Sequence, residues 1–246
     1  MRARLGCITL IVGLGGVAAV AVAAKQWAIH DKNRPQPPIV TPGQAGSPPS
    51  DAIVLFDGSS LDAWQSAGTG KQPGWRIVDG ILEVVPKAGD IKTKRQFGDL
   101  QLHLEFATPV GEEGSGQDLG NSGVFLAGRY EVQVLNSYQN PTYPDGQCAS
   151  AYGQQPPLVN ASKAPGKWQT LDIIFHRPRF ENGTCVQPAT VTVLHNGVLV
   201  QDHFAYHGPT KHKTKAPYQE HGPDVIRLQE HKNPVRYRNI WVRDLE

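Results

Sequence analysis

DLQLHLEFA (residues 99–107) alternates apolar and polar side chains without a break. Successive side chains of a β-strand point to opposite faces of its sheet. One face of this stretch would therefore carry Leu100, Leu102, Leu104 and Phe106, and the other would carry Gln101, His103 and Glu105. A strand that is apolar on one face only is typical of an antiparallel sheet.

Short strands and tight turns continue through the rest of the C-terminal region. Asp79-Gly80 and Asn196-Gly197 each separate two apolar runs, and both dipeptides favour the two-residue turn of a β-hairpin. Further strands are predicted within residues 170–178, 225–231 and 237–245. No stretch predicts a helix longer than a turn or two. We therefore expect an all-β fold in which two antiparallel sheets stack as a sandwich.

The N-terminal region differs in composition from the rest of the chain. Residues 7–24 are apolar and follow a short basic start, which predicts a signal peptide or an N-terminal membrane anchor over residues 1–24. Residues 25–51 are rich in proline and predict a linker, and residues 52–246 predict one domain. In either case the domain is expected to be periplasmic or extracellular, tethered to the membrane through residues 7–24 if they are retained.

The balance of charge argues against one class of partner. The 246 residues include 24 Lys and Arg and 22 Asp and Glu, so the net charge is +2. These basic residues do not form the clusters that a nucleic-acid surface requires, which excludes a nucleic-acid partner. The sequence leaves the oligomeric state open.

Cys148 and Cys185 are the two cysteines of the predicted domain. In an oxidising compartment, two cysteines of one domain can form a disulfide. We expect this bridge, with two buried free thiols as the alternative.

GRYEVQVLNSY (residues 128–138) would have a polar face as well as an apolar one. Its residues at 130, 132 and 134 would face the core, and the other face would carry Arg129, Glu131 and Gln133. Side chains two apart on a strand lie roughly 6.5–7 Å apart, which a sugar ring can bridge. A solvated outer face is the alternative, but the glycine-framed context and the nearby Asn121 favour a site for a polyol.

A second group of candidates lies outside that strand. His231 ends a predicted strand, where an imidazole can act as an acid, a base or a metal ligand, although an ordinary loop histidine is the alternative. Lys94 and Arg238 are cations that could reach the same cleft. The loop 207–223 holds three histidines and three lysines without zinc-site spacing, and we interpret it as solvated.

Two irregular stretches, 108–122 and 136–166, are too long to be plain connections. Long ordered loops of this kind usually carry function. Tyr152 and Trp168 lie in or next to the second stretch and could offer stacking surfaces to a sugar, although Trp168 could equally belong to the core.

Six ordered blocks of sequence carry a resemblance to a known family. They are LFDGSSLDAW, TKRQFGDLQLHLEF, GNSGVFLAGRYEVQVLNSY, YGQQPPLVNASKAPGKWQTLDIIFHRPRF, VTVLHNGVLVQD and RLQEHKNPVRYRNIWVRDL. Over nearly all of residues 52–246 the chain resembles the 3-keto-disaccharide hydrolases (3-keto-glucoside 1,2-lyase/3-keto-2-hydroxy-glucal hydratase domains). The resemblance implies a concanavalin A-like (laminin G-like) jelly-roll sandwich and an exported enzyme. The chain departs from the family pattern at Asn136, where aspartate is common.

The resemblance implies a chemistry that needs only one base. An ordinary glycosidase requires two carboxylates, whereas the polar face around residue 131 offers only Glu131. In a 3-keto sugar the C2 proton is acidified by the ketone, so one base can remove it and the C1 substituent can leave. Glu131 or His231 would be the base, and Asn121 and Gln133 would orient hydroxyls.

The enolate formed in that reaction requires a positive charge nearby. Arg129, Lys94 or a bound divalent metal ion would supply it, and no other cofactor is implied.

Two other functions fit the same residues. A non-catalytic, lectin-like carbohydrate-binding module would use the same fold without a competent base. A classical glycosidase would need a second carboxylate near Glu131, for which Glu105 is the nearest candidate in type.

Overall fold

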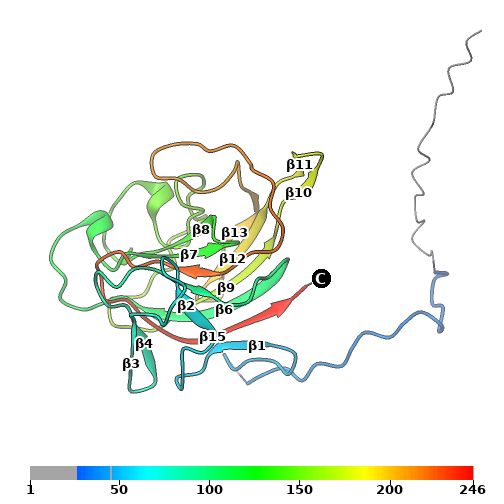
Figure 1. Ribbon diagram of the computed structural model, residues 1–246, viewed down its shortest axis with the longest axis horizontal. Helices are drawn as coiled ribbons and strands as arrows, with labels where there is room; N and C mark the ends of the chain where they lie inside the picture. The colour runs from blue at the N-terminus through cyan, green and yellow to red at the C-terminus, as the bar shows by residue number, and fades with distance from the viewer. Residues whose placement is uncertain (1–26, 45, 246) are drawn as a thin grey trace, which may run out of the picture. The chain divides into compact units, whose positions relative to one another are not determined.

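The computed structural model describes residues 27–44 and 46–245 (Figure 1). The chain divides into two units, Met1–Ile39 and Val40–Glu246. The predicted signal peptide or anchor over residues 1–24 lies outside the described residues. Within the described part, the structure has no helix of the length and apolar character that a membrane crossing requires.

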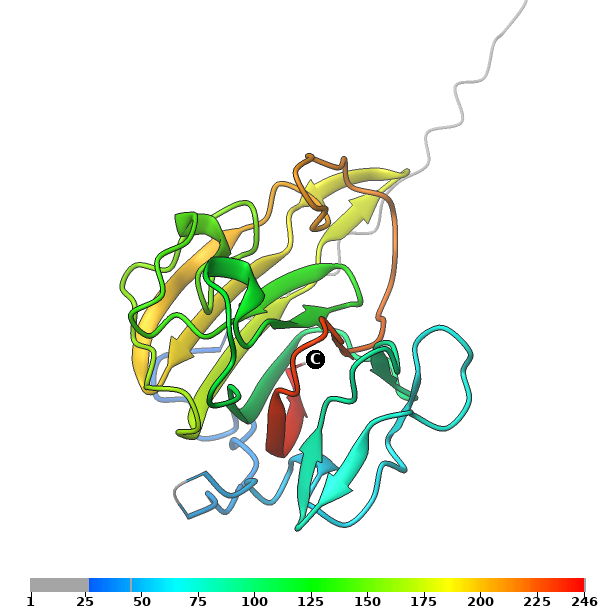
Figure 2. The ribbon, with the colours of Figure 1, turned by 90° about the vertical axis from the view of Figure 1, so that its left-hand side faces the viewer.

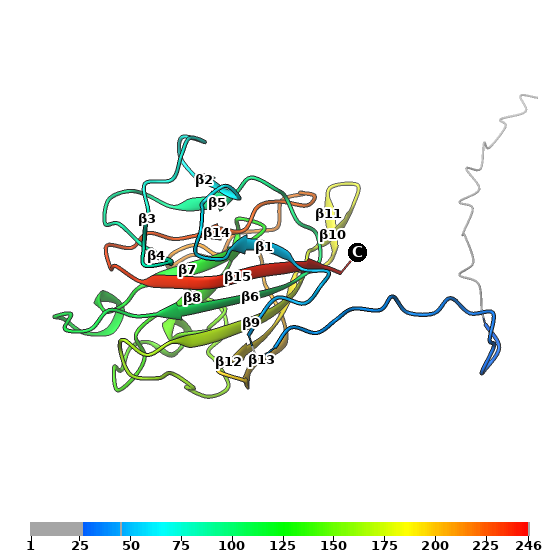
Figure 3. The ribbon, with the colours of Figure 1, turned by 90° about the horizontal axis from the view of Figure 1, so that it is seen from below.

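The second unit is an all-β sandwich of two antiparallel sheets, as predicted (Figures 1 and 3). The larger sheet has eight strands, in the order β13 (Val198–Ala205), β12 (Thr190–His195), β9 (Gln169–His176), β6 (Leu100–Ala107), β15 (Arg236–Asp244), β4 (Ile81–Glu83) and β3 (Arg76–Val78), with β1 (Ile53–Phe56) also paired to β15. Figure 3 shows β1, β15, β6 and β9 side by side in this sheet.

The smaller sheet has five strands and carries the site described below. Its order is β2 (Trp64–Ser66), β5 (Ile91–Thr93), β14 (Arg227–Leu228), β7 (Ser122–Leu126) and β8 (Tyr130–Val134). A separate hairpin of β10 (Arg179–Glu181) and β11 (Thr184–Gln187) projects beside the sandwich (Figure 2). The helical content of the described residues is two short 3-10 turns, Gly116–Asp118 and Pro144–Gly146.

The alternation in two strands builds the core between the sheets. Leu102, Leu104 and Phe106 of β6 have no exposed surface, and the same holds for Tyr130 and the two valines of β8. All of them belong to one hydrophobic cluster. Full burial of an apolar side chain of this size contributes about 1.5–3 kcal/mol, so each of these six side chains stabilises the sandwich.

Both predicted hairpins are present, and their turns have the expected conformation. Asp79 and Gly80 connect β3 to β4 with φ angles of 51° and 73°. Asn196 and Gly197 connect β12 to β13 with φ angles of 53° and 78°. A type I′ turn requires positive φ at both central residues, which asparagine, aspartate and glycine tolerate best.

The C-terminal part of the predicted linker packs against the larger sheet. The carbonyl oxygen of Gly46 accepts hydrogen bonds from the side chains of Asn239 and Trp241 on β15. Arg243 of the same strand forms an ion pair with Asp51 at 2.6 Å. The end of the predicted linker therefore contacts the larger sheet, and it belongs to the second compact unit, Val40–Glu246.

The predicted disulfide is wrong, because both cysteines are free thiols. Cys148 is buried in the core between the sheets. Cys185 lies on the projecting hairpin, where its thiol donates a hydrogen bond to the carbonyl oxygen of Gln187 at 3.3 Å.

Truncation of a core side chain tests which residues of the strands face the core and which face outward. Leu104→Ala is expected to lower the free energy of unfolding by about 2–5 kcal/mol, because it leaves a cavity between the sheets. Ile174→Ala removes a similar side chain that is 37% exposed on neighbouring β9, so its cost should stay below about 1 kcal/mol. Urea unfolding of both variants gives the two values, and equal losses would contradict the assigned faces.

Candidate functional site

A pocket of about 310 Å³ lies on the outer face of the smaller sheet. Its floor comes from β7 and β8, where Phe125 pairs with Glu131 and Gly123 pairs with Gln133. The described residues that line it are Gln117, Asn121, Phe125, Glu131, Gln133, Tyr152, Thr210, Lys211, His212, Gln229 and His231. Amide, hydroxyl and imidazole groups dominate this set, and such groups hydrogen-bond well to a polyol.

Glu131 is the only acidic residue among these lining residues, and it is 4% exposed. Burial raises its pKa to about 8, and the modest opposing effect of Arg227 is itself countered by Asp90. With its amide nitrogen turned toward Glu131, Gln133 donates to Glu131 Oε1 at 3.1 Å and to the carbonyl oxygen of Ser122 at 3.2 Å. A carboxyl group with a pKa near neutrality can both give and take a proton in a reaction.

Gly123 gives the carboxyl group of Glu131 its space. A Cβ atom at this position would lie 2.3 Å from Glu131 Oε1 and 3.0 Å from the ring of Phe125. Any larger residue would have to displace the acid from the floor of the pocket.

Two loop segments cover the free edge of β8 and complete the walls. The backbone N–H of Gln133 donates to the carbonyl oxygen of Ser150 at 3.0 Å, and that of Tyr152 donates to the carbonyl oxygen of Glu131 at 3.2 Å. The backbone N–H of Glu131 donates to Thr210 Oγ1 at 3.0 Å. Unpaired strand edges are otherwise costly, so these bonds hold the loops in place and bring Tyr152 and Lys211 to the pocket.

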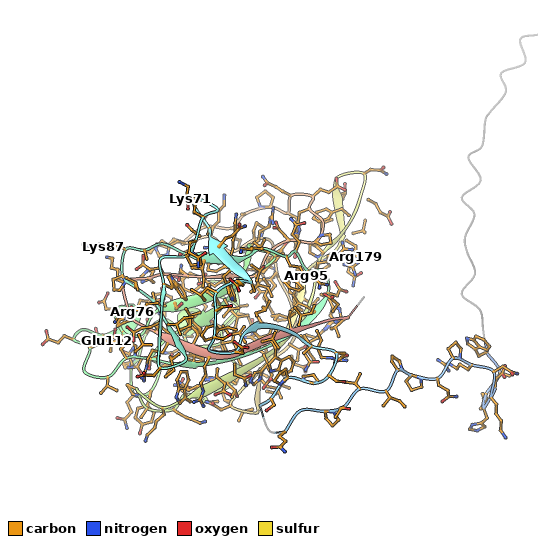
Figure 4. The ribbon with its side chains drawn as sticks, turned by 60° about the horizontal axis from the view of Figure 1, so that its bottom comes forward. Lys71, Arg76, Lys87, Arg95, Glu112 and Arg179 are labelled. Atoms are coloured by element: carbon orange, nitrogen blue, oxygen red, sulfur yellow. The ribbon has the colours of Figure 1, made fainter. Side chains whose placement is uncertain are left out.

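A polar network fixes the opposite wall. The side-chain oxygen of Asn233 accepts the backbone N–H of Asn121 at 3.0 Å, and its nitrogen donates to Glu112 at 2.6 Å. Glu112, labelled in Figure 4, also accepts the backbone N–H of Gly120 at 2.7 Å. The turn that follows His231 is thereby joined to the loop that carries Asn121.

A positive group stands beside the pocket but is already paired. The guanidinium group of Arg227 lies 3.6 Å from the centroid of the Phe125 ring and forms an ion pair with Asp90. Because Asp90 neutralises it, Arg227 does not hold Glu131 in its charged form.

The structure gathers four of the seven predicted site residues around this pocket: Glu131, His231, Asn121 and Gln133. Arg129 lines a neighbouring hollow and pairs with Asp224. Lys94 is exposed and does not line the pocket.

Arg238 lies on the other sheet, so the expectation that it reaches this cleft is wrong. It pairs with Glu105 at 2.6 Å and stacks over Trp168 at 4.1 Å. Glu105 and Trp168 are therefore also excluded as the second carboxylate and the sugar platform of this pocket. Asn136 does not line the pocket either, and its backbone N–H donates to the carbonyl oxygen of Leu119 at 3.1 Å.

Several lining residues were not singled out from the sequence. Lys211 and His212 belong to the loop that was interpreted as solvated, and Gln117 lies in the irregular stretch before β7. The pairing of Thr210 with β8 is a long-range contact that no local pattern signals. The run of lysines and histidines over 207–215 was the one available signal.

Metal ligands do not cluster in the described part of the chain. Within residues 27–44 and 46–245, no three His, Cys, Asp or Glu side chains gather to hold an ion. A divalent cation at this pocket would have Glu131 as its one carboxylate ligand, and we assign it no step.

The raised pKa of Glu131 makes a prediction about stability. Its folded pKa of about 8 exceeds that of an exposed glutamate, so the folded state holds this proton more tightly than the unfolded chain. The stabilisation is complete at acidic pH and is lost as pH rises toward 8, by up to roughly 1.4 kcal/mol per pH unit. Glu131→Gln removes this loss, so the variant should gain stability relative to the wild type between pH 5 and pH 8.

Urea unfolding of both proteins at each pH measures the difference. Glu105→Gln is the matched control, because the pKa of Glu105 is lowered. Burial raises this pKa, but the hydrogen bonds from Asn239 and Arg238 outweigh the effect of burial. If the free energies of unfolding of the wild type and Glu131→Gln differed by the same amount at every pH, Glu131 would be an ordinary ionised carboxylate.

Known proteins with a related fold support a carbohydrate-active site. A crystal structure of a candidate glycosyl hydrolase from Parabacteroides distasonis has 45% sequence identity and a TM-score of 0.84, covering 88% of this chain and 95% of that one. A second candidate glycosyl hydrolase from the same organism has 18% identity and a TM-score of 0.58, over 80% and 94% of the two chains, and shows the fold alone.

No curated protein matches the chain in sequence. The family model of the 3-keto-alpha-glucoside-1,2-lyase-like domain matches residues 51–243. The match covers most of the chain, and the protein therefore belongs to the 3-keto-alpha-glucoside-1,2-lyase-like family.

Proposed function

We propose that this protein is an exported enzyme that cleaves 3-keto-glycosides by removal of the C2 proton, elimination and rehydration. The observation that carries the proposal is the single buried carboxyl group of Glu131 on the floor of a polar pocket. Both classical routes of glycoside hydrolysis use two carboxyl groups across the scissile bond. Elimination next to a ketone does not need a second carboxyl group, and Glu131 is the one carboxyl group among the lining residues.

The reaction proceeds in two balanced stages. Glu131 in its ionised form takes the C2 proton, and the electron pair of that bond forms an enolate with the C3 carbonyl. The enolate then expels the C1 substituent, which takes a proton and leaves as an alcohol, so that C1 and C2 become doubly bonded. Water adds to C1 and a proton returns to C2, and the sum of the two stages is hydrolysis.

The raised pKa suits Glu131 to this exchange. A carboxylate with a pKa of about 8 is a stronger base than an ordinary glutamate, and once protonated it can return the proton to the leaving group or to C2. His231 and His212 lie in the same pocket and are the candidates for a second acid–base group.

The enolate oxygen needs a positive charge close to the sugar. Lys211 lines the pocket, and no ion pair holds its side chain within the described residues, whereas Arg129 is paired with Asp224. We assign the stabilising role to Lys211, in place of the cations expected from the sequence. Asn121 and Gln133 would hold the sugar hydroxyls.

Removal of the acid–base group tests the proposal directly. Glu131→Gln should lower kcat for a 3-keto-glucoside by about a hundredfold or more, and His231→Ala should do the same if it is the partner group. Glu105→Gln, on the other sheet, should leave kcat within about twofold. Thermal unfolding of each variant at pH 6 confirms that it is folded.

The substrates separate the competing functions. Cleavage of the native glycoside as fast as the 3-keto form would identify an ordinary glycosidase. Binding without turnover of either substrate would identify a lectin-like module.

The close approach of Gly123 gives an independent test. Gly123→Ala places a methyl group against Glu131 Oε1, and displacement of a catalytic group by about 1 Å costs roughly a hundredfold in rate. We expect kcat to fall roughly tenfold to hundredfold. Gly68→Ala is the control, since a Cβ there has no neighbour within 4 Å. Full activity of Gly123→Ala would remove Glu131 from the reaction.

A further inference from the structure

A second groove adjoins the pocket of Glu131 and has a different chemistry. Its volume is about 390 Å³. It shares Tyr152, Lys211 and His212 with the first pocket, so the two are continuous along these side chains. Its other described lining residues are Tyr143, Asp145, Gly153, Lys213, Thr214 and Lys215.

One wall of this groove is a pair of tyrosines. The hydroxyl groups of Tyr143 and Tyr152 are 2.8 Å apart, and the two rings meet at 67° with centroids 6.3 Å apart. Tyr152 also lies 3.3 Å from Nδ1 of His212. Tyr143 is 42% exposed, although an aromatic ring is usually better buried. Aromatic rings that are held in place by such contacts, and that keep one surface exposed to solvent, form platforms on which a sugar can stack.

Another part of the lining is cationic. Lys211, Lys213 and Lys215 all line the groove, and Asp145 is the one acid among its lining residues. Within the described part of the chain, none of the three lysines forms an ion pair. These lysines come from the connection between β13 and β14, the orange loop at the top of Figure 1. Three unpaired ammonium groups against one carboxylate favour an anion.

We propose that this groove binds the leaving group of the substrate, and that the leaving group is a sugar carrying a carboxylate or another acidic substituent. The proposal rests on the proposed function, which places the 3-keto sugar over Glu131. The scissile bond then lies between the two pockets, beside Tyr152, Lys211 and His212. The leaving sugar stacks on the tyrosines, and its acidic group faces Lys213 and Lys215.

A matched pair of substrates tests this specificity. Two 3-keto-glucosyl disaccharides of the same linkage are compared, one with glucose and one with glucuronate as the leaving sugar. The wild type should have the lower KM for the glucuronate substrate. Lys213→Gln with Lys215→Gln should raise that KM roughly threefold to tenfold and leave the KM for the glucose substrate within about twofold.

The control removes the same two charges elsewhere. Lys71, labelled in Figure 4, and Lys167 are exposed on other loops, so Lys71→Gln with Lys167→Gln should not change either KM. The preference for glucuronate should also weaken in high salt, because exposed charges are screened. Equal KM values for the two substrates in the wild type would overturn the inference. So would a Lys213/Lys215 variant in which the ratio of the two KM values is the same as in the wild type.

A binding measurement keeps the inference separate from the proposed function. Glucuronate and glucose are titrated into the full protein and followed by ligand-observed NMR, which needs no turnover. Glucuronate should bind to the wild type more tightly than glucose, and the Lys213/Lys215 variant should lose the difference. This result without turnover of either disaccharide would sink the proposed function and keep the anionic groove. Turnover of the disaccharides without a difference in binding between glucuronate and glucose would overturn the anionic groove and keep the proposed function.

Discussion

The site depends on the burial of one carboxyl group on a strand whose opposite face is core. Tyr130, Val132 and Val134 pack between the sheets, so β8 cannot slip by one residue without exposing them. That constraint fixes Glu131 on the outer face, where Gly123 leaves it room. The loops that cover the edge of β8 then close it off from water.

Burial acts on two glutamates of this fold with opposite results. Glu105, on the larger sheet, is paired with Arg238 and hydrogen-bonded to Asn239, and its pKa is lowered. Glu131 has no such cation, because the neighbouring Arg227 is neutralised by Asp90, and its pKa is raised. Unpaired burial of an acid costs stability, and acids with a raised pKa cluster at functional sites, which supports the role we propose for Glu131.

The fold class and its hairpins could be predicted from local patterns, whereas the assignment of strands to sheets and much of the site could not. Strand alternation and the Asn-Gly and Asp-Gly turns depend on neighbouring residues, so the sandwich and its hairpins follow from the sequence. Arg238 was misplaced because alternation within a strand does not say which sheet the strand joins. Lys211 was missed because its position depends on the pairing of Thr210 with β8, residues that are about eighty apart in the chain.

The placement of residues on strands or on loops suggests how the proposed chemistry and its specificity are separated in the molecule. The proposed acid–base group, Glu131, and its amide partner, Gln133, both lie on β8, whose register with β7 is set by the core. The tyrosines and lysines of the second groove lie on loops that are held through a few hydrogen bonds to the edge of β8. Changes in those loops leave the strand register intact, so under the proposed function the leaving group can vary while the chemistry at Glu131 stays the same.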